Sequence, residues 1–302
     1  MNLSVNIGKL KLKNPIMVAS GTFGKEYGDF FDINILGAYV AKTITLKARA
    51  GNPPPRVTEA FAGMLNSIGL ENKGVEDFIN KKLPELKNIK IPIVASIAGD
   101  SPEEYAALVR RLNTVGRIGA IELNLSCPNV KHGMRSGLIA QDEKAVYAFV
   151  KKARGSTGKT LIAKLSPNVT DITAIALAAE RAGCDALSLV NTFPALAVDV
   201  ETSRPALGNI TGGLSGPAIK PIALKMVRDV YNKVRIPVIG IGGIMDYNDA
   251  LEFMICGAAA IQIGTANFVN PEAPVEILKG IKGYLRRKNI TDIKKVIGSL
   301  KA

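Results

Sequence analysis

Eight short apolar runs that alternate with amphipathic stretches predict that this chain of 302 residues is an α/β protein with a (β/α)₈ fold, the TIM barrel. The length suits one large barrel, and polar residues recur where the apolar runs end, as expected at the catalytic face of such a fold. A doubly wound parallel sheet is the alternative that the pattern leaves open. We expect one ligand-binding domain over residues 1–302.

The predicted strands are rich in β-branched and other apolar residues, which is typical of strands covered on both faces. They span residues 15–20, 38–43, 91–97, 120–125, 161–165, 186–190, 237–241 and 260–263. Because parallel strands need a crossover between them, the stretches that separate these runs are expected to hold helices.

Three of those stretches carry clear helix starts. Ser101-Pro102-Glu103-Glu104 combines a cap residue, a first-turn proline and two acids that favour the positive end of the helix dipole, and it predicts a helix over 101–113. Asp residues open two similar segments, at 171–182 and 246–256.

The remaining segments decorate the two ends of the predicted barrel. Residues 3–12 alternate polar and apolar around Gly8-Lys9, which predicts a hairpin that closes the bottom of the barrel. Insertions at 46–64 and 194–214 follow the second and sixth strands and are rich in Pro, Gly and Thr. They fall on the catalytic face, so we expect lids or hairpins that face a partner.

Composition excludes several classes of protein. The net charge is +13, but Lys and Arg are scattered over predicted helices, which argues against nucleic-acid binding. We see neither a secretory signal at the start nor a run long enough to cross a bilayer, so we expect a soluble, cytoplasmic protein with no membrane contact. The three cysteines are widely separated and predict neither a disulfide framework nor a metal site.

One cysteine stands in a chemically distinctive position. In Asn124-Leu-Ser-Cys127-Pro-Asn129 a thiol lies between two carboxamides where the fourth strand ends. A thiolate there can accept a proton, and the carboxamides can bind a planar polar substrate, so Cys127 is the candidate acid/base residue. Cys184 and Cys256 lie at the opposite ends of strands and are expected to pack inertly. His132, the only histidine, is interpreted as an ordinary loop residue rather than a base.

Lysines and glycines at other strand ends indicate a phosphorylated ligand. Lys42 and Lys164 are the second-last residues of the second and fifth predicted strands, where they must face anionic groups or reach solvent. The seventh and eighth strands end in glycines, whose bare backbone can approach a phosphate closely. With no metal cluster, this set favours flavin mononucleotide (FMN) chemistry over hydrolysis, and Lys164 is best placed to stabilise negative charge on a reduced flavin.

Two other functions remain open from the residues alone. A non-flavin phosphate-binding barrel, such as a phosphosugar isomerase, would need a carboxylate base, for which Glu122 is the candidate. A barrel that only binds a phosphate ligand is the non-enzymatic alternative, but it has no need of a thiol beside two carboxamides.

Taken together, the strand-end motifs resemble those of class 1 dihydroorotate dehydrogenases, in particular the 1B type. The cysteine itself is similar to the class 1 base, where class 2 enzymes use serine. The resemblance covers almost the whole chain and rests on Ala19-Ser20-Gly21-Thr22-Phe23-Gly24, Lys42-Thr43, Asn66-Ser-Ile-Gly69-Leu70-Glu-Asn72, Asn124-Leu-Ser-Cys127-Pro-Asn129-Val-Lys-His-Gly133, Lys164-Leu-Ser-Pro167-Asn168, Asn191-Thr192, Gly242-Gly243 and Gly264-Thr265.

The resemblance implies a reaction and a set of site residues. Cys127 would take a proton from carbon 5 of (S)-dihydroorotate while hydride leaves carbon 6 for flavin N5, which gives orotate for pyrimidine synthesis. Asn129 would order the substrate or the cysteine loop. The implied substrate-binding residues are Lys42, Asn66, Ser67, Ile68, Gly69, Leu70, Asn124, Asn129, Asn191 and Thr192. The implied FMN-binding residues are Ser20, Gly21, Lys42, Thr43, Asn124, Lys164, Val190, Gly216, Gly242, Gly243, Gly264 and Thr265.

The resemblance also implies partners. In the 1B type a second subunit carries FAD and a [2Fe-2S] cluster and passes electrons to NAD, around a homodimer of the catalytic chain, so a heterotetramer is expected. The fumarate-dependent 1A type is the alternative. Two departures stand out. Ser96 replaces an Asn of the family, so one flavin contact is expected to differ from the family's. Lys131-His-Gly-Met-Arg-Ser-Gly137 is poorer in glycine than the usual loop, so the mobility of this loop is expected to differ.

Overall fold

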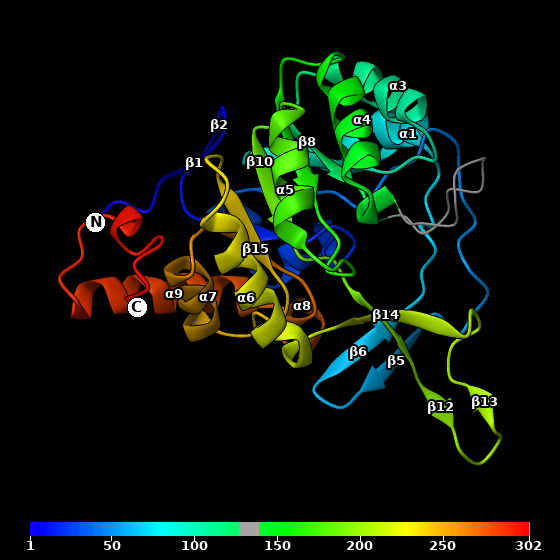
Figure 1. The fold of residues 1–302 in the computed structure, drawn as a ribbon. Helices are drawn as coiled ribbons and strands as arrows, with labels where there is room; N and C mark the ends of the chain where they lie inside the picture. Colours follow the sequence, from blue (N-terminus) through cyan, green and yellow to red (C-terminus); the bar gives the residue numbers. More distant parts are fainter. Residues whose placement is uncertain (127–138, 302) are drawn as a thin grey trace.

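The computed structural model describes residues 1–126 and 139–301, and its central feature is an eight-stranded parallel sheet that curls into a barrel (Figure 1). The order is β3-β16-β15-β10-β9-β8-β7-β4, and a parallel bridge between Met17 and Ala38 joins the two ends. The strands are β3 (Ile16–Val18), β4 (Tyr39–Val40), β7 (Ile93–Ile97), β8 (Ile118–Asn124), β9 (Thr160–Lys164), β10 (Ala186–Leu189), β15 (Val238–Ile241) and β16 (Ala258–Ile263). All eight predicted strands are present, so the (β/α)₈ prediction is confirmed.

The strands are buried because their apolar residues point both into the barrel and toward the helices. Every residue of β7, β9, β10 and β15 is buried. Such burial on both faces explains why these segments read as continuous apolar runs rather than as alternating patterns.

Helices surround the strands (Figure 1). They are α1 (Val75–Asp77), α2 (Leu83–Glu85), α3 (Pro102–Asn113), α4 (Glu143–Arg154), α5 (Ile172–Arg181), α6 (Lys220–Tyr231), α7 (Tyr247–Ile255), α8 (Ala266–Val269) and α9 (Ala273–Arg287). The predicted caps are present: Ser101 Oγ accepts from Glu104 N at 3.2 Å, and Asp171 and Asp246 cap α5 and α7. Between β3 and β4 the connection is made of 3₁₀ turns, Lys25–Asp29 and Ile33–Ile35.

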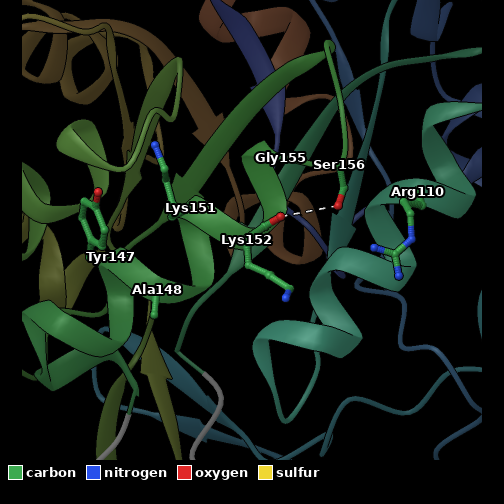
Figure 2. Close-up of a pocket in the computed structure, with 7 residues that line it drawn as sticks. All are labelled: Arg110, Tyr147, Ala148, Lys151, Lys152, Gly155 and Ser156. Carbon is green, nitrogen blue, oxygen red and sulfur yellow. Dashed lines mark hydrogen bonds between the residues drawn. The ribbon is translucent and has the colours of Figure 1, made fainter.

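The outer surface of α3 and α4 carries a shallow hollow of about 510 Å³ (Figure 2). Exposed Arg110, Tyr147, Lys151 and Lys152 line it, and the one hydrogen bond drawn there joins Lys152 O to Ser156 Oγ at 3.4 Å. No buried polar group points into this hollow from the residues that line it, so it has the character of a solvated helix surface.

The amino-terminal hairpin lies at the bottom of the barrel. It consists of β1 (Val5–Ile7) and β2 (Leu10–Leu12), joined at Gly8, whose φ of +57° suits a residue without a Cβ. Lys9 N donates to the hydroxyl of Thr160, the first residue of β9, at 3.2 Å. The predicted hairpin and its position are therefore confirmed.

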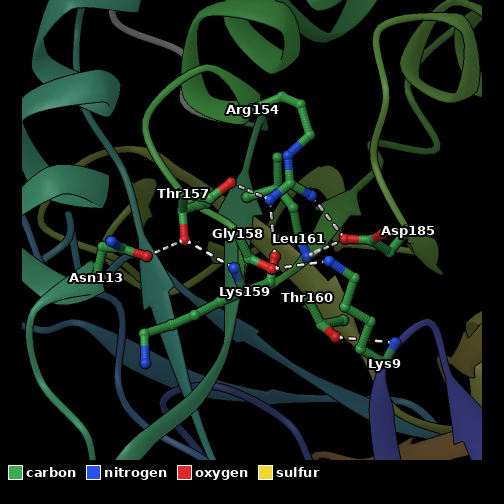
Figure 3. Close-up of polar contacts among 9 residues, drawn as sticks. All are labelled: Lys9, Asn113, Arg154, Thr157, Gly158, Lys159, Thr160, Leu161 and Asp185. Carbon is green, nitrogen blue, oxygen red and sulfur yellow. Dashed lines mark hydrogen bonds and ion pairs between the residues drawn. The ribbon is translucent and has the colours of Figure 1, made fainter.

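A polar network fastens the same end of the barrel (Figure 3). Asp185, just before β10, accepts from Arg154 Nη1 at 2.7 Å and from Leu161 N at 2.8 Å. Arg154 also donates to the carbonyls of Thr157 and Lys159. The network ties the end of α4 to the starts of β9 and β10.

The two insertions form hairpins that pair with each other. The segments β5 (Val57–Ala60), β6 (Gly63–Asn66), β11 (Phe193–Leu196) and β14 (Thr211–Ser215) make an antiparallel sheet in the order β11-β14-β6-β5, to which the small hairpin β12 (Val198–Asp199) and β13 (Arg204–Pro205) is attached. Hairpins were expected here, but the sequence did not predict that the two insertions pair in one sheet. We call these strands the insertion sheet; it projects from the barrel in Figure 1.

Candidate functional site

A cavity of about 530 Å³ opens at the carboxyl ends of the barrel strands, between the barrel and the insertion sheet. Its wall includes the residues that follow β3, β4, β9, β10, β15 and β16, the last residue of β8, and residues of β6 and β14. Both its size and its position are those of a ligand site in this fold.

The structure brings the predicted site residues together in this cavity. All of those within the described ranges line it: Ser20, Gly21, Lys42, Thr43, Asn66, Ser67, Ile68, Gly69, Leu70, Asn124, Lys164, Val190, Asn191, Thr192, Gly216, Gly242, Gly243, Gly264 and Thr265. Cys127, Asn129 and His132 lie outside the described residues. Placement in the wall does not assign a role, so the individual contacts stay predictions.

The side chains of two lysines in the cavity wall have no partner among the described residues. The Lys164 side chain comes from β9 and is buried, whereas Lys42 is exposed, and neither makes an ion pair or hydrogen bond with a residue in 1–126 or 139–301. By contrast, nearby Lys220 Nζ donates to Asp249 Oδ1 at 2.6 Å and lies 3.0 Å from Glu252 Oε2, and the hydrogen bond that Lys220 donates to Asp249 raises the pKa of Lys220. A buried ammonium without a partner is costly, so this cavity suits an anionic or electron-rich ligand.

Two side-chain carboxamides in the cavity wall are hydrogen-bonded to each other. Asn191 Nδ2 donates to Asn124 Oδ1 at 3.2 Å, and Asn191 Oδ1 accepts from Thr192 N at 2.8 Å. These bonds fix which atom of each carboxamide is oxygen. Asn124 Nδ2 has no hydrogen-bond partner among the described residues, and it is therefore a donor that a polar ligand can use.

Asn168 is a cavity residue without a predicted role, although its motif carries part of the resemblance. Its Nδ2 donates to Ser166 Oγ at 3.0 Å and to Thr192 O at 3.2 Å, which links the loops after β9 and β10. The run Pro167-Asn168 after a strand was the available signal. Gly213 and Ser215 also line the cavity, but no motif near them in the sequence indicates this, because β14 reaches the cavity only through the insertion sheet.

The glycine-lined end of the cavity is shaped by backbone conformation. Gly242 and Gly243 have φ of +122° and +79°, and a Cβ on Gly243 would lie 2.7 Å from Lys220 Cβ. Gly264 differs, since a Cβ there would meet no atom closer than 3.5 Å. The first two glycines are thus required by the protein itself, whereas the space beside Gly264 remains open for a ligand group.

The loop of 66–72 that covers the cavity is held in an unusual conformation. Leu70 has φ of +57°, a left-handed conformation that costs a non-glycine residue about 1 kcal/mol. Asn72 holds the loop in place: its Oδ1 accepts from Thr45 N and Gly74 N, and its Nδ2 donates to Leu70 O at 2.8 Å. Strain of this kind gathers where a loop must present its backbone to a ligand.

A chain of hydroxyls supports the other wall. Ser20 Oγ and Thr43 Oγ1 lie 3.0 Å apart, and Thr43 Oγ1 lies 3.0 Å from Ser96 Oγ. Ser96 is fully buried and is not part of the cavity wall. Ser96, at the position where the resemblance implies an Asn, therefore supports Thr43 from outside the cavity.

Glu122, the candidate base of a non-flavin isomerase, is also outside the cavity wall. Its side chain is fully buried, and Oε2 accepts from Ser188 Oγ at 3.0 Å and Gln262 Nε2 at 2.7 Å. A carboxylate so enclosed cannot reach a ligand in the cavity, which removes the feature that favoured that alternative.

Other chemistry is limited in the described part of the chain. Residues 1–126 and 139–301 contain no group of His, Cys, Asp and Glu placed to hold a metal ion, and no helix in these ranges has the length and apolar character needed to span a bilayer. Cys184 is buried, and this burial raises the pKa of its thiol far above the ordinary range. As expected, Cys184 is a packing residue.

The fold and the cavity define a (β/α)₈ barrel with a ligand site at the carboxyl ends of its strands, and this site suits an anionic or electron-rich ligand. The dihydroorotate dehydrogenase family model matches residues 2–285, and this chain belongs to that family.

Curated relatives agree over the full length. The chain is 54% identical to the "Dihydroorotate dehydrogenase B (NAD(+)), catalytic subunit" of Caldicellulosiruptor bescii, with 99% of each chain covered. Proteins of the same name from Trichlorobacter lovleyi and Geobacter sulfurreducens are 52% and 50% identical, with 99% of this chain and 98% of each relative covered.

Proposed function

We propose that this chain is the catalytic subunit of an NAD-linked dihydroorotate dehydrogenase and oxidises (S)-dihydroorotate to orotate in de novo pyrimidine (UMP) biosynthesis. Membership of the family and the names of the full-length relatives support the activity. The structural observation that carries the proposal is that Lys164 is buried and has no side-chain partner in residues 1–126 or 139–301, in a cavity whose far end is lined by glycines.

FMN fits the residues that are present. Gly243, Gly264 and Thr265 would bind its phosphate as hydrogen-bond donors, and Lys164 would face the edge of the ring where negative charge develops on reduction. The other proposed FMN contacts are Ser20, Gly21, Lys42, Thr43, Asn124, Val190, Gly216 and Gly242. When bound, FMN supplies the acceptor for the hydride that leaves carbon 6 of the substrate.

The chain's own residues would bind the substrate and remove its proton. Asn124, Asn191 and Thr192, with Lys42, offer donors and acceptors for a carboxylate and a cyclic urea. The thiolate of Cys127, three residues beyond Asn124, takes the proton of carbon 5, so that loss of a proton and a hydride leaves the carbon 5 to carbon 6 double bond of orotate. Asn66, Ser67, Ile68, Gly69, Leu70 and Asn129 complete the proposed substrate site.

Electrons would leave through a second subunit. The relatives are named as catalytic subunits that use NAD(+), and we propose a partner that carries FAD and a [2Fe-2S] cluster, in a heterotetramer around a homodimer of this chain. Exposed apolar side chains on the insertion sheet and its loops support an interface: Phe61 is 99% exposed, and Leu196, Val198, Val200 and Ile210 are more than half exposed.

We further propose that residues 1–302 form one FMN-binding domain that works in the cytoplasm. The packing of α9 against α7, and the bridge from Asn2 to Asp292, join the two ends of the described chain to the barrel and support one domain.

A visible spectrum of the purified chain, recorded without oxygen before and after addition of dihydroorotate, tests the flavin function. The protein is expected to be yellow and to bleach when substrate is added. A colourless protein, or a yellow one that dihydroorotate leaves unchanged, would contradict the proposal.

The acceptor is tested separately with the isolated chain. We expect negligible orotate formation with fumarate, and NAD-dependent turnover only after a flavin and iron-sulfur subunit is added. Efficient turnover with fumarate alone would identify the 1A type of enzyme instead.

A further inference from the structure

Three polar side chains meet inside the barrel, where aliphatic residues usually pack. They are Glu122 of β8, Ser188 of β10 and Gln262 of β16, and all three are fully inaccessible to solvent. Glu122 Oε2 receives hydrogen bonds from both of the others, at 3.0 and 2.7 Å. Glu122 Oε1 and Gln262 Oε1 have no hydrogen-bond partner in the described structure.

These residues form one layer across the barrel. In chain order β8, β10 and β16 are the fourth, sixth and eighth strands of the closed sheet, and alternate strands contribute to the same interior layer. The hydrogen bond from Gln262 to Glu122 therefore joins strands on opposite sides of the barrel.

The layer lies directly below the cavity. Glu122, Ser188 and Gln262 each precede a cavity residue by two positions, and those residues are Asn124, Val190 and Gly264 respectively. Since strand side chains alternate between the two faces, Glu122 and Asn124 share the interior face of β8. The polar layer is thus the floor of the proposed flavin site.

The barrel interior also holds a side chain whose formal charge is opposite to that of a glutamate. Among the buried residues of the described chain, only Glu122 and Lys164 have formally charged side chains. Their strands are neighbours: Glu122 pairs with Ile162 and Asn124 with Lys164, so along β8 the lysine is level with the residue two positions beyond Glu122. On its other side Lys164 pairs with Ser188 of the layer. No ion pair joins Glu122 and Lys164 directly.

We propose that Glu122 is an anion that acts as the counter-charge of Lys164 and thereby sets the electrostatic potential at the floor of the cavity. Two hydrogen-bond donors stabilise the carboxylate, and Lys164 balances its charge within the water-excluded interior. Glu122 is a positioning residue, because it touches neither the cavity nor a ligand in it. The inference rests on the proposed FMN function.

The charge has a definite consequence for a redox ligand. A ligand that gains negative charge on reduction is harder to reduce when an anion lies beneath it, so Glu122 is expected to offset part of the effect of Lys164. Removing the anion should therefore raise the midpoint potential of the bound flavin.

The variant that tests this is Glu122→Gln in the holoprotein. A glutamine oxygen can still accept from Ser188 and Gln262, and its amide can donate to Gln262 Oε1, so the layer remains hydrogen-bonded. We expect the midpoint potential to rise by about 30 mV, a tenfold change in the equilibrium of a two-electron couple. An unchanged or lower potential would overturn the inference.

Ser188→Ala is the matched control, because it removes one hydrogen bond to the same carboxylate oxygen and leaves the charge. Its potential should move less than that of the glutamine variant. An equal rise in both variants would assign the effect to hydrogen bonding and would also overturn the inference.

A measurement on the unaltered protein covers the case in which Glu122→Gln does not fold. Glu122 is the only buried glutamate of the described chain, and residues 127–138 contain no glutamate. The infrared spectrum of holoprotein with ¹³C-labelled glutamate at about pH 9, where exposed carboxyls are ionised, should show no label-sensitive band of a protonated carboxyl group. Such a band would refute the anion.

The two proposals fail in different ways. If the unaltered chain binds no FMN or is not reduced by dihydroorotate, the proposed function fails. If it does both and Glu122→Gln has the same potential as the parent, only the role of Glu122 is lost.

Discussion

The two ends of the barrel differ in whether their charged side chains have partners within the described chain. At the amino end, Arg154 and Asp185 form a 2.7 Å ion pair and share further hydrogen bonds with the backbone (Figure 3). At the carboxyl end, Lys42 and Lys164 have no partner in the described chain, and Leu70 is held in a left-handed conformation. The charged groups at the amino end are hydrogen-bonded by the protein, whereas the two lysines at the carboxyl end are available to bind a ligand.

Strand β9 carries this contrast within a few residues. Just before its start, Lys159 Nζ donates to the carbonyls of Val115 at 3.2 Å and Ile118 at 2.8 Å. At its end, Lys164 is more deeply buried, and its ammonium has no such acceptor in the part of the chain that the structure describes. Stability and ligand binding should therefore be separable by mutations at the two ends of the strand.

The largest effect is expected at the carboxyl end, from Cys127→Ala. Loss of a general base should lower turnover of dihydroorotate by about 10²–10⁴-fold, while FMN binding stays nearly intact because the alanine removes only the thiol. Steady-state kinetics and the flavin content of the purified variant measure the two quantities. Unchanged turnover would exclude Cys127 as the base.

Lys164→Met should follow, with FMN binding weakened about 10- to 100-fold, as expected when a hydrogen bond to a charged group is lost. The free energy of unfolding of the apoprotein should fall by no more than about 1 kcal/mol, since relief of a buried ammonium that has no hydrogen-bond partner in the described chain offsets the loss of the counter-charge proposed for Glu122. Flavin fluorescence titration and urea unfolding check both expectations.

Lys159→Met is the matched control for Lys164→Met. It should lower the free energy of unfolding by about 1–2 kcal/mol and leave FMN binding unchanged.

At the amino end, Asp185→Ala should lower the free energy of unfolding by about 1–3 kcal/mol, because Arg154 and Leu161 N lose their acceptor in a partly buried position. Urea unfolding gives this value, and kinetics should show unaltered turnover. Asp229→Ala, which removes an exposed ion pair with Lys225, should change stability by well under 1 kcal/mol. If both variants lost the same free energy of unfolding, the network around Asp185 would contribute no more to stability than an exposed ion pair.

The smallest effect is expected for Gly264→Ala. The protein has room for the added methyl group, so the free energy of unfolding should change by less than about 0.5 kcal/mol. FMN binding should nevertheless weaken about tenfold, equivalent to about 1.4 kcal/mol, because the methyl group occupies space proposed for the phosphate. Unchanged FMN affinity would place the phosphate away from Gly264.

Much of the site could be predicted because the strand ends can be recognised in the sequence. Once the fifth strand is seen to end at Lys164 and the eighth before Gly264, the parallel barrel requires both residues to face one opening. Helix starts were also predictable, since Ser101 and Asp246 act through hydrogen bonds to residues two or three positions away.

Contacts between distant segments could not be predicted in this way. The pairing of Asn66 with Gly213 joins two insertions into one sheet, and it depends on where the barrel places their ends. The local pattern made Glu122 a possible base because it shares a strand face with Asn124, and only the closed barrel shows that Gln262 encloses it from the opposite side.

The sequence by itself determined the eight strands, the capped helices, the bottom hairpin and the residues that end each strand, because periodicity and capping act over a few neighbouring residues. The tertiary structure alone decided which charges find a partner, because closure of the barrel sets the distances between strands far apart in the chain. It paired Arg154 with Asp185 at one end, and at the other it left Lys164 without a partner in the described chain.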